Sequence, residues 1–235
     1  MKLTDRLIKI MPAYSWIPLA TAFSWNMIVY SGSKIIAGDW HHYNIETQLD
    51  LAIPFLPWTI LIYFGCYLFW IANYILSVRQ GQEETWRFLS ADFLAKCICL
   101  FFFLAFPTTN TRPEVVPEGF WGTLMHFLYT VDSADNLFPS IHCLTSWFCY
   151  IGVRGRKNIP VAYRTFSCVA AVAVFLSTLT TKQHVLADVV AGVLLAELCY
   201  FIAGHTRLAC WYGDVFSRIN SSLRFHPKGE TAGEK

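Results

Sequence analysis

The chain has 235 residues, of which 55% are hydrophobic and only 14% are charged. Soluble globular domains carry about 25% charged residues, so this composition excludes an ordinary soluble domain. The formal net charge of +2 is too small to predict a nucleic-acid-binding protein, and no nucleic-acid-binding motif occurs. The apolar residues are grouped in long runs separated by short polar stretches, which is typical of a helical protein that crosses a membrane several times.

Six apolar runs are predicted to be membrane spans, because a hydrocarbon core of about 30 Å requires about 20 apolar residues per helix. They cover residues 16–37, 51–77, 91–106, 139–153, 161–180 and 184–204. Polar residues interrupt the first run, and the third and fourth are short. The predicted fold class is all-α, a polytopic membrane protein with six transmembrane helices in one bundle over residues 1–219. Residues 220–235 are polar and are predicted to form a disordered cytoplasmic tail.

Lysines and arginines predict the orientation of the spans, because they are enriched in cytoplasmic loops. The segments on one side carry Lys2, Arg6, Lys9, Arg79, Arg87, Arg154, Arg156, Lys157, Arg164, Arg207, Arg218, Arg224, Lys228 and Lys235. The other side carries only Lys34, Arg112 and Lys182. Both termini are therefore predicted to be cytoplasmic, in an integral protein of the plasma (inner) membrane.

Polar residues from three distant segments are predicted to meet at the extracytoplasmic face. These segments are the loop before the fourth span, the start of that span, and the connection between the fifth and sixth spans. All three lie at about the same depth in the predicted topology. Their polar residues are Arg112, Ser140, His142, Lys182, His184 and Asp188.

His184 and Asp188 are four residues apart, so they share one helix face and can form a contact. A carboxylate that binds one imidazole nitrogen selects the tautomer and makes the other nitrogen a better nucleophile or base. An ionisable residue near the edge of an apolar helix also usually has a partner and a function. The alternative interpretation is a structural pair that joins two helices.

Pro139-Ser140-Ile141-His142 is predicted to begin a helix, since proline suits the first turn. The free N–H groups at such an end attract phosphate, and His142 can then donate a proton to a leaving oxygen. The alternative is a helix cap at a water interface.

Arg112 has the geometry to bind phosphate oxygens, although a loop arginine is commonly only solvated. Lys182 is interpreted either as an interface anchor or as a phosphate contact.

The three segments together resemble the type 2 phosphatidic acid phosphatase superfamily of lipid phosphatases and phosphotransferases. That family carries the patterns K-x6-RP, PSGH and SR-x5-H-x3-D in this order. The corresponding stretches here are TRP, which contains Arg112, then PSIH, which ends at His142, and STLTTKQHVLAD, which contains His184 and Asp188. The order, the gaps and the six-span layout all match.

The resemblance implies a reaction that uses no metal ion and no other cofactor. His184 would attack phosphorus and form a phosphohistidine, and Asp188 would orient it. His142 would protonate the departing group. Arg112, Ser140 and backbone N–H groups would stabilise the charge on the phosphoryl oxygens.

The eight cysteines form no C-x-x-C pair and are interpreted as small buried hydrophobic residues.

Two departures from the family pattern concern phosphate-binding cations. The family lysine corresponds to Ala105, and the family arginine of the third block corresponds to Thr178. Lys182, one helical turn after Thr178, is hypothesised to replace that arginine in part. A third block without its arginine is also similar to the branch that contains sphingomyelin and inositol phosphorylceramide synthases, which transfer a phospho-headgroup to a lipid alcohol.

The predicted function is a membrane lipid phosphatase that acts at the extracytoplasmic face on phosphatidic acid, phosphatidylglycerol phosphate or a polyprenyl diphosphate. Its predicted partners are the lipid phosphate and the bilayer, without nucleic acid. The first alternative is a lipid headgroup phosphotransferase of the same fold. An alternative of another class is a haem-binding membrane cytochrome with His142 and His184 as axial ligands. A catalytically inactive relative that serves as a scaffold or flippase is the last alternative.

Overall fold

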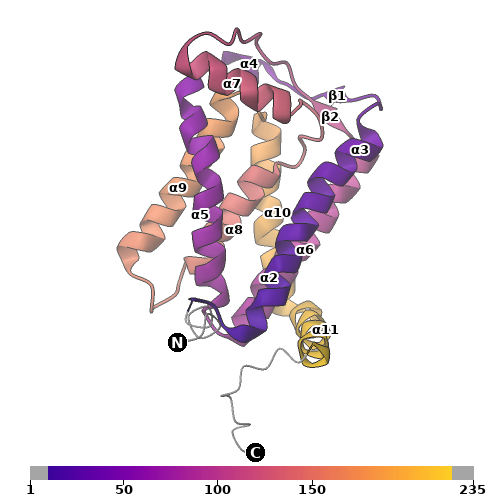
Figure 1. The fold of residues 1–235 in the computed structure, drawn as a ribbon, viewed down its shortest axis with the longest axis vertical. Coiled ribbons are helices and arrows are strands. Elements are labelled where there is room, and N and C mark those ends of the chain that lie inside the picture. Colours follow the sequence, from indigo (N-terminus) through magenta and orange to yellow (C-terminus); the bar gives the residue numbers. More distant parts are fainter. Residues whose placement is uncertain (1–9, 224–235) are drawn as a thin grey trace, which may run out of the picture.

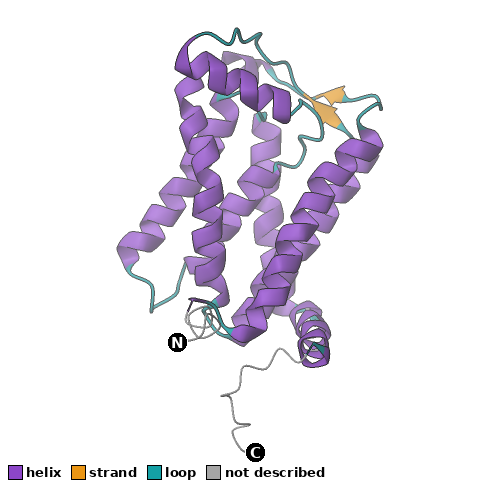
Figure 2. Ribbon diagram, viewed as in Figure 1, coloured by secondary structure: helices purple, strands orange, loops and turns teal. Residues whose placement is uncertain are grey.

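Helices make up nearly all the regular structure of residues 10–223, the part of the chain that the computed structural model describes (Figures 1 and 2). The longer helices are α2 (Trp16–Met27), α5 (Ile60–Val78), α6 (Gln82–Ala105), α7 (Gly119–Val131), α8 (Ile141–Val153), α9 (Val161–Thr180), α10 (Leu186–His205) and α11 (Leu208–Ser222). The short elements are η1 (Ala13–Ser15), the π-helical turn η2 (Ile28–Gly32), α3 (Ser33–Ala37), α4 (Gln48–Ala52) and η3 (Pro57–Thr59). Strands β1 (Tyr43–Asn44) and β2 (Thr108–Thr109) form a parallel pair.

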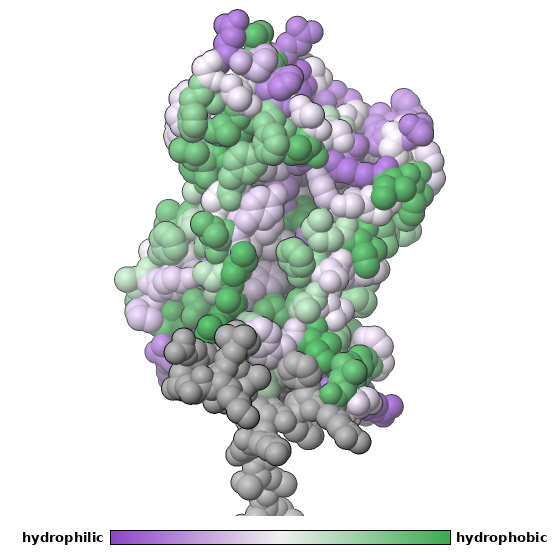
Figure 3. Space-filling view, in the orientation of Figure 1, coloured by the Kyte–Doolittle hydropathy of each residue, from purple (hydrophilic) through white to green (hydrophobic). Residues whose placement is uncertain are grey.

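The predicted all-α membrane architecture is confirmed. Within residues 10–223, four helical segments are long and apolar enough to cross a membrane: Pro57–Val78, Gln82–Ala105, Val161–Thr180 and Leu186–His205. Helix α8 is apolar but shorter, and η2 divides the first predicted span, so the total of six spans stays a prediction. Hydrophobic residues cover much of the side of the bundle in Figure 3, and hydrophilic residues gather at the end that carries α4, α7, β1 and β2. We call this the α7 end, and the opposite one the α11 end.

Three predicted boundaries differ clearly from the observed helices. The second span was predicted to begin at residue 51, but the observed segment begins at Pro57, because residues 48–52 form the separate helix α4. Helix α6 begins at Gln82, nine residues before the predicted span, because its first turns are stabilised by packing against α11, with Trp86 beside Tyr212. The predicted disordered tail was wrong at its start, since residues 220–222 belong to α11. Asn220 is buried there and its side-chain amide donates to the Tyr14 carbonyl at 3.1 Å. The rest of the predicted tail, from residue 224, lies outside the described residues.

Helix α8 occupies the centre of the bundle, where α5, α6, α9 and α10 pack around it. Its first turn lies directly against α10. A Cβ added at Gly192 would stand 2.7 Å from the backbone oxygen of Ser140, so only glycine permits this approach. The Ser140 N–H also donates to the Asp188 carbonyl at 3.2 Å. The amino-terminal ends of α8 and α10 are therefore held together at the α7 end.

Candidate active site

His184 and Asp188 form a buried pair at the start of α10. Nδ1 of His184 lies 3.2 Å from Oδ2 of Asp188, and the same oxygen accepts from the Val185 N–H at 2.9 Å. A carboxylate can only accept, so Nδ1 carries the proton and Nε2 is the basic nitrogen. Asp188 is fully buried and His184 is 8% exposed. The pair predicted from the four-residue spacing is present, and its geometry suits a nucleophilic imidazole.

A tight turn between α9 and α10 delivers His184. The Thr178 carbonyl accepts from the N–H groups of Gln183 and His184, at 2.9 and 3.1 Å. Lys182 adopts the left-handed conformation, with φ of 54°, which ends α9 in the manner of a helix C-cap. The histidine therefore follows a backbone turn that is anchored by hydrogen bonds to the preceding helix.

His142 lies in the first turn of α8 and faces His184, with 5.8 Å between the ring centroids. Its ring packs against Tyr63 at 4.6 Å and Trp70 at 5.5 Å between centroids. Nε2 of His142 is buried and has no hydrogen-bond partner among the described residues. A free imidazole nitrogen beside a second histidine is suited to transfer a proton to or from a bound molecule.

Ser140 is the N-cap of α8. Its Oγ accepts from the Cys143 N–H at 3.2 Å, and the residue is fully buried. This is the helix-capping role that the sequence left as an alternative to phosphate binding. Because Oγ accepts the backbone hydrogen bond through a lone pair, Ser140 can still donate its hydroxyl hydrogen to a ligand.

Arg112 reaches the turn that carries His184. Its guanidinium donates to the Asp132 carbonyl and, at 2.7 Å, to Oε1 of Gln183, and it stacks over the Tyr129 ring at 4.9 Å. Gln183 is 2% exposed, and its Nε2 has no hydrogen-bond partner among the described residues. Sequence reasoning missed Gln183, although its position beside His184 was the available signal. Arg112 therefore contacts Gln183, the residue directly before the predicted nucleophile in the chain.

Lys182 is directed to a different part of the α7 end. Its ammonium donates to the backbone carbonyls of Asp50 and Ile53, at 2.9 and 2.7 Å, and so binds the carboxyl-terminal end of α4. A cation is favoured at such a helix end. The hypothesis that Lys182 replaces the arginine missing at Thr178 stays a prediction, but its present contacts are structural. Thr178 itself is fully buried and donates to the Phe175 carbonyl at 2.8 Å.

A cluster of charged residues borders the two histidines and was not predicted. One narrow pocket is lined by both imidazoles and by Tyr30, Phe103, Asp132, Asp135, Asn136, Leu137, Ile141 and Gln183. Lys34 lies 3.0 Å from Asp132 and 2.9 Å from Asp135. The hydroxyl of Tyr63 donates to Asp132 at 2.9 Å, and that of Tyr30 donates to the same carboxylate. These residues carry no motif, so only their position in space identifies them.

Asp132 makes the stability of this cluster depend on pH. Burial alone would raise the pKa of Asp132, but the Lys34 ammonium and the Tyr30 hydroxyl lower it from 3.8 to about 2. Because the pKa of Asp132 is lower in the folded state, its ionised form stabilises the fold at any pH above the unfolded pKa of 3.8. This stabilisation is lost as the pH falls from 3.8 to the folded pKa of about 2. We expect about 2 kcal/mol to be lost between pH 4 and pH 2.

Thermal unfolding in detergent from pH 6 to pH 2 measures this effect, and Asp132→Asn should flatten the acid limb. Asp214→Asn, at an exposed position on α11, is the matched control and should keep the wild-type slope. Equal acid slopes for wild type and Asp132→Asn would contradict the assignment.

An apolar cavity of about 560 Å³ opens between α2 and α5. Figure 3 shows the surface hollowed on this side. Tyr67 and Trp70 line the cavity, and their rings lie 6.3 and 5.5 Å from the His142 ring. The same two side chains therefore border both the cavity and the candidate site.

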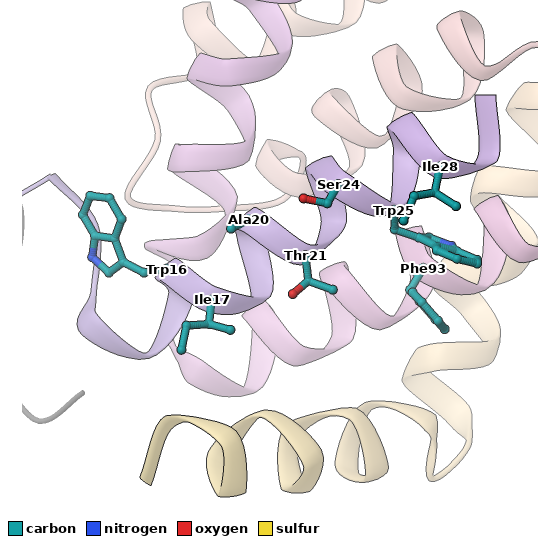
Figure 4. Close-up of a pocket in the computed structure, with 8 residues that line it drawn as sticks. All are labelled: Trp16, Ile17, Ala20, Thr21, Ser24, Trp25, Ile28 and Phe93. Atoms are coloured by element: carbon teal, nitrogen blue, oxygen red, sulfur yellow. The ribbon is translucent and has the colours of Figure 1, made fainter. Parts of the chain in front are cut away.

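A second apolar hollow follows α2 and holds none of the candidate site residues. Its lining residues, drawn in Figure 4, are Trp16, Ile17, Ala20, Thr21, Ser24, Trp25, Ile28 and Phe93. All but Phe93 come from α2 and the following turn. We assign this hollow no part in the site.

The fold and the site define a helical membrane protein with a histidine–carboxylate pair, a facing histidine and a nearby arginine. Residues 52–202 match the family model described as the PAP2 superfamily, and this range contains all three motif blocks. The chain belongs to this superfamily, the type 2 phosphatidic acid phosphatases, whose members are generally phosphatases. Membership supports a phosphatase-type function on lipid phosphates in general. Neither the curated proteins nor the solved structures include a match.

Proposed function

We propose that this protein is a lipid phosphatase that hydrolyses a lipid phosphate at the extracytoplasmic face through a phosphohistidine at His184. The observation that carries the proposal is the buried Asp188 carboxylate on Nδ1 of His184, with the His142 ring 5.8 Å away. One histidine is oriented as a nucleophile and the other has a free nitrogen for proton transfer. Together they supply the groups for a two-step displacement at phosphorus.

In the first step, the Nε2 lone pair of His184 attacks phosphorus and the bond to the lipid oxygen breaks. Protonated His142 gives its proton to that leaving oxygen, so the lipid departs as an alcohol. In the second step, neutral His142 removes a proton from water, which attacks phosphorus and releases inorganic phosphate from His184. Arg112 and the Ser140 hydroxyl stabilise the phosphoryl oxygens. The scheme requires no metal ion.

The cavity between α2 and α5 supports a lipid as the substrate. It lies among membrane-spanning helices, and its walls are almost entirely apolar apart from Lys96, Thr145 and Asn26. Because Tyr67 and Trp70 join it to His142, a hydrocarbon chain in the cavity would leave a phosphate at the histidines. Phosphatidic acid, phosphatidylglycerol phosphate and polyprenyl diphosphates all have this form.

The distribution of basic residues supports an extracytoplasmic site in the plasma membrane. Arg79, Arg87, Arg154, Arg164 and Arg207 lie at or beside the helix ends that gather at the α11 end. The candidate site lies at the opposite end. Since basic residues favour the cytoplasmic side, the α11 end is proposed to face the cytoplasm.

A lipid headgroup phosphotransferase is the second candidate. It is favoured by the absence of a cation at Ala105 and Thr178, because a phosphodiester carries less charge than a phosphomonoester and requires fewer cations. The same histidines would act, with a lipid alcohol in place of water.

A haem protein is less compatible with the geometry, because aromatic rings pack directly against His142 and the pocket between the histidines is narrow. A Soret band in the purified protein would reinstate it.

The first experiment measures phosphate release from a panel of lipid phosphates by the purified protein in detergent containing EDTA. Release that persists in EDTA, together with acid-labile radioactive label on the protein from a labelled substrate, is the expected result. A new labelled phospholipid on addition of diacylglycerol or ceramide, with little free phosphate, would replace the phosphatase by the transferase. Neither product from any lipid would overturn the proposal.

A further inference from the structure

Phosphoryl transfer at this site requires positive charge that the recognised motif lacks. Ala105 is an exposed residue at the end of α6, and Thr178 is buried with its hydroxyl bound to the α9 backbone. Lys182 is bound to α4. Of the motif positions, Arg112 alone brings a cation toward the histidines. A second cation beside the phosphate must come from elsewhere in the fold.

Lys34, from the first predicted span, forms ion pairs with two carboxylates that line this pocket. Its Nζ lies within 3.0 Å of both Asp132 and Asp135, and these two carboxylates line the pocket together with His142 and His184. The lysine side chain is only 17% exposed. The ammonium is therefore held by two pocket-lining carboxylates, one contact away from the residues that surround the imidazoles.

The π-helical turn at Ile28–Gly32 explains how a residue of the first span faces inward. A π turn inserts one residue into an α-helix and so rotates the following side chains by about 100°. After this turn, the Lys34 ammonium lies 4.6 Å from the centre of the Tyr30 ring, and Tyr30 itself donates to Asp132. The irregularity brings both side chains to the polar cluster, and such turns are frequent at functional sites.

Two of the contacts of Lys34 are weak enough for a ligand to replace them. Two of them are short ion pairs with carboxylates, whereas those to the carbonyl and hydroxyl of Ser133 are long, at 3.4 and 3.3 Å. A phosphate oxygen at the pocket can replace the Ser133 contacts while both carboxylates keep the ammonium in place. A charge-assisted bond of this kind is stronger than the neutral contacts it replaces.

We propose that Lys34 is the phosphate-binding cation of this site, in place of the cations missing at Ala105 and Thr178, and that Asp132 and Asp135 position it. The proposal rests on the proposed phosphoryl-transfer function and adds a binding residue from outside the motif blocks.

The test measures the binding of inorganic vanadate, a phosphate analogue, to the purified full chain by calorimetry in detergent. Lys34→Gln should weaken binding by about 10- to 100-fold, the range for loss of one charge-assisted hydrogen bond. Lys34→Arg should restore most of the affinity. Lys157→Gln removes the same charge from an exposed loop at the α11 end and should bind as the wild type does.

A second variant separates phosphate binding from a purely structural role, because Lys34→Gln alone leaves two carboxylates uncompensated. Lys34→Gln combined with Asp135→Asn reduces that excess charge. The proposal expects this double variant to recover thermal stability but to remain weak in vanadate binding. Recovery of wild-type vanadate affinity would show that Lys34 only neutralises the carboxylates and would overturn the inference.

Lipid turnover, measured in parallel, distinguishes this inference from the proposed function. Normal vanadate binding by Lys34→Gln, with wild-type turnover intact, refutes the role of Lys34 and leaves the phosphatase standing. Vanadate binding that depends on Lys34 without turnover of any lipid supports the cation site and refutes the phosphatase. A wild-type protein that binds no vanadate refutes the cation site.

Discussion

Replacement of His184 by alanine should lower the turnover of a lipid phosphate by about 10⁴-fold or more, which is typical for loss of a catalytic nucleophile. The reason is geometric, because Asp188 contacts this imidazole through Nδ1 and leaves Nε2 free for the proposed attack on phosphorus. The residue lies in the turn just before α10, outside the packed helices of the bundle, so its removal should leave most of the bundle intact. Initial rates with the preferred lipid measure the effect.

His205→Ala is the matched control, since His205 is exposed at the opposite end of the same helix. It should retain wild-type rates. Acid-labile phosphate on the protein should also vanish in His184→Ala and persist in the control. Turnover by His184→Ala within tenfold of the wild type would exclude this residue as the nucleophile.

Replacement of Lys96 by methionine should strongly reduce the stability of the protein. Lys96 and Asp92 form a 2.8 Å ion pair within α6, with side chains 3% and 0% exposed, and the Tyr74 hydroxyl donates to the same carboxylate at 2.7 Å. Removal of one partner leaves a buried charge without compensation, which costs about 3–5 kcal/mol. For a protein of this size that corresponds to a loss of about 10 °C in Tm.

Thermal unfolding in detergent tests this prediction. The double variant Lys96→Met with Asp92→Asn should recover most of the lost stability, because an amide keeps the acceptor for Tyr74 without a charge. Lys157→Met, at an exposed position, should unfold as the wild type does. A double variant no more stable than the single one would mean that the charge pair is not the source of the effect.

The candidate site was predictable where its residues are close in the chain. The four-residue spacing of His184 and Asp188 predicted their contact, although the reason differs from the expected shared helix face. Helix α10 begins at Leu186, and the Asp188 carboxylate reaches back over the helix start to the Val185 N–H and to His184. The position of His142 in the first turn of α8 was likewise predictable from the proline and serine before it. The meeting of the two histidines followed from topology, because both helices begin on the same side of the predicted bundle.

The cluster around Lys34 was not predictable in this way. Lys34, Asp132 and Gln183 belong to three segments, and each has an ordinary composition for a loop or helix end. The π turn that rotates Lys34 inward is a local break in helical periodicity, which a hydropathy pattern does not reveal. Lys182 shows the converse, since its spacing indicated the site but its left-handed backbone directs the ammonium to α4.

The amino-acid sequence alone was enough to predict a helical membrane protein and to predict which residues form the centre of the candidate site. Long apolar runs require a membrane, and short-range spacing with helix starts places His142, His184 and Asp188 together. The charged residues that surround them became known only from the folded structure. The partners of a charged side chain depend on how the helices pack. That packing depends on helix crossings such as the one at Gly192 and on the π turn before Lys34. Neither can be predicted from local sequence, because each is stabilised by contacts between distant segments.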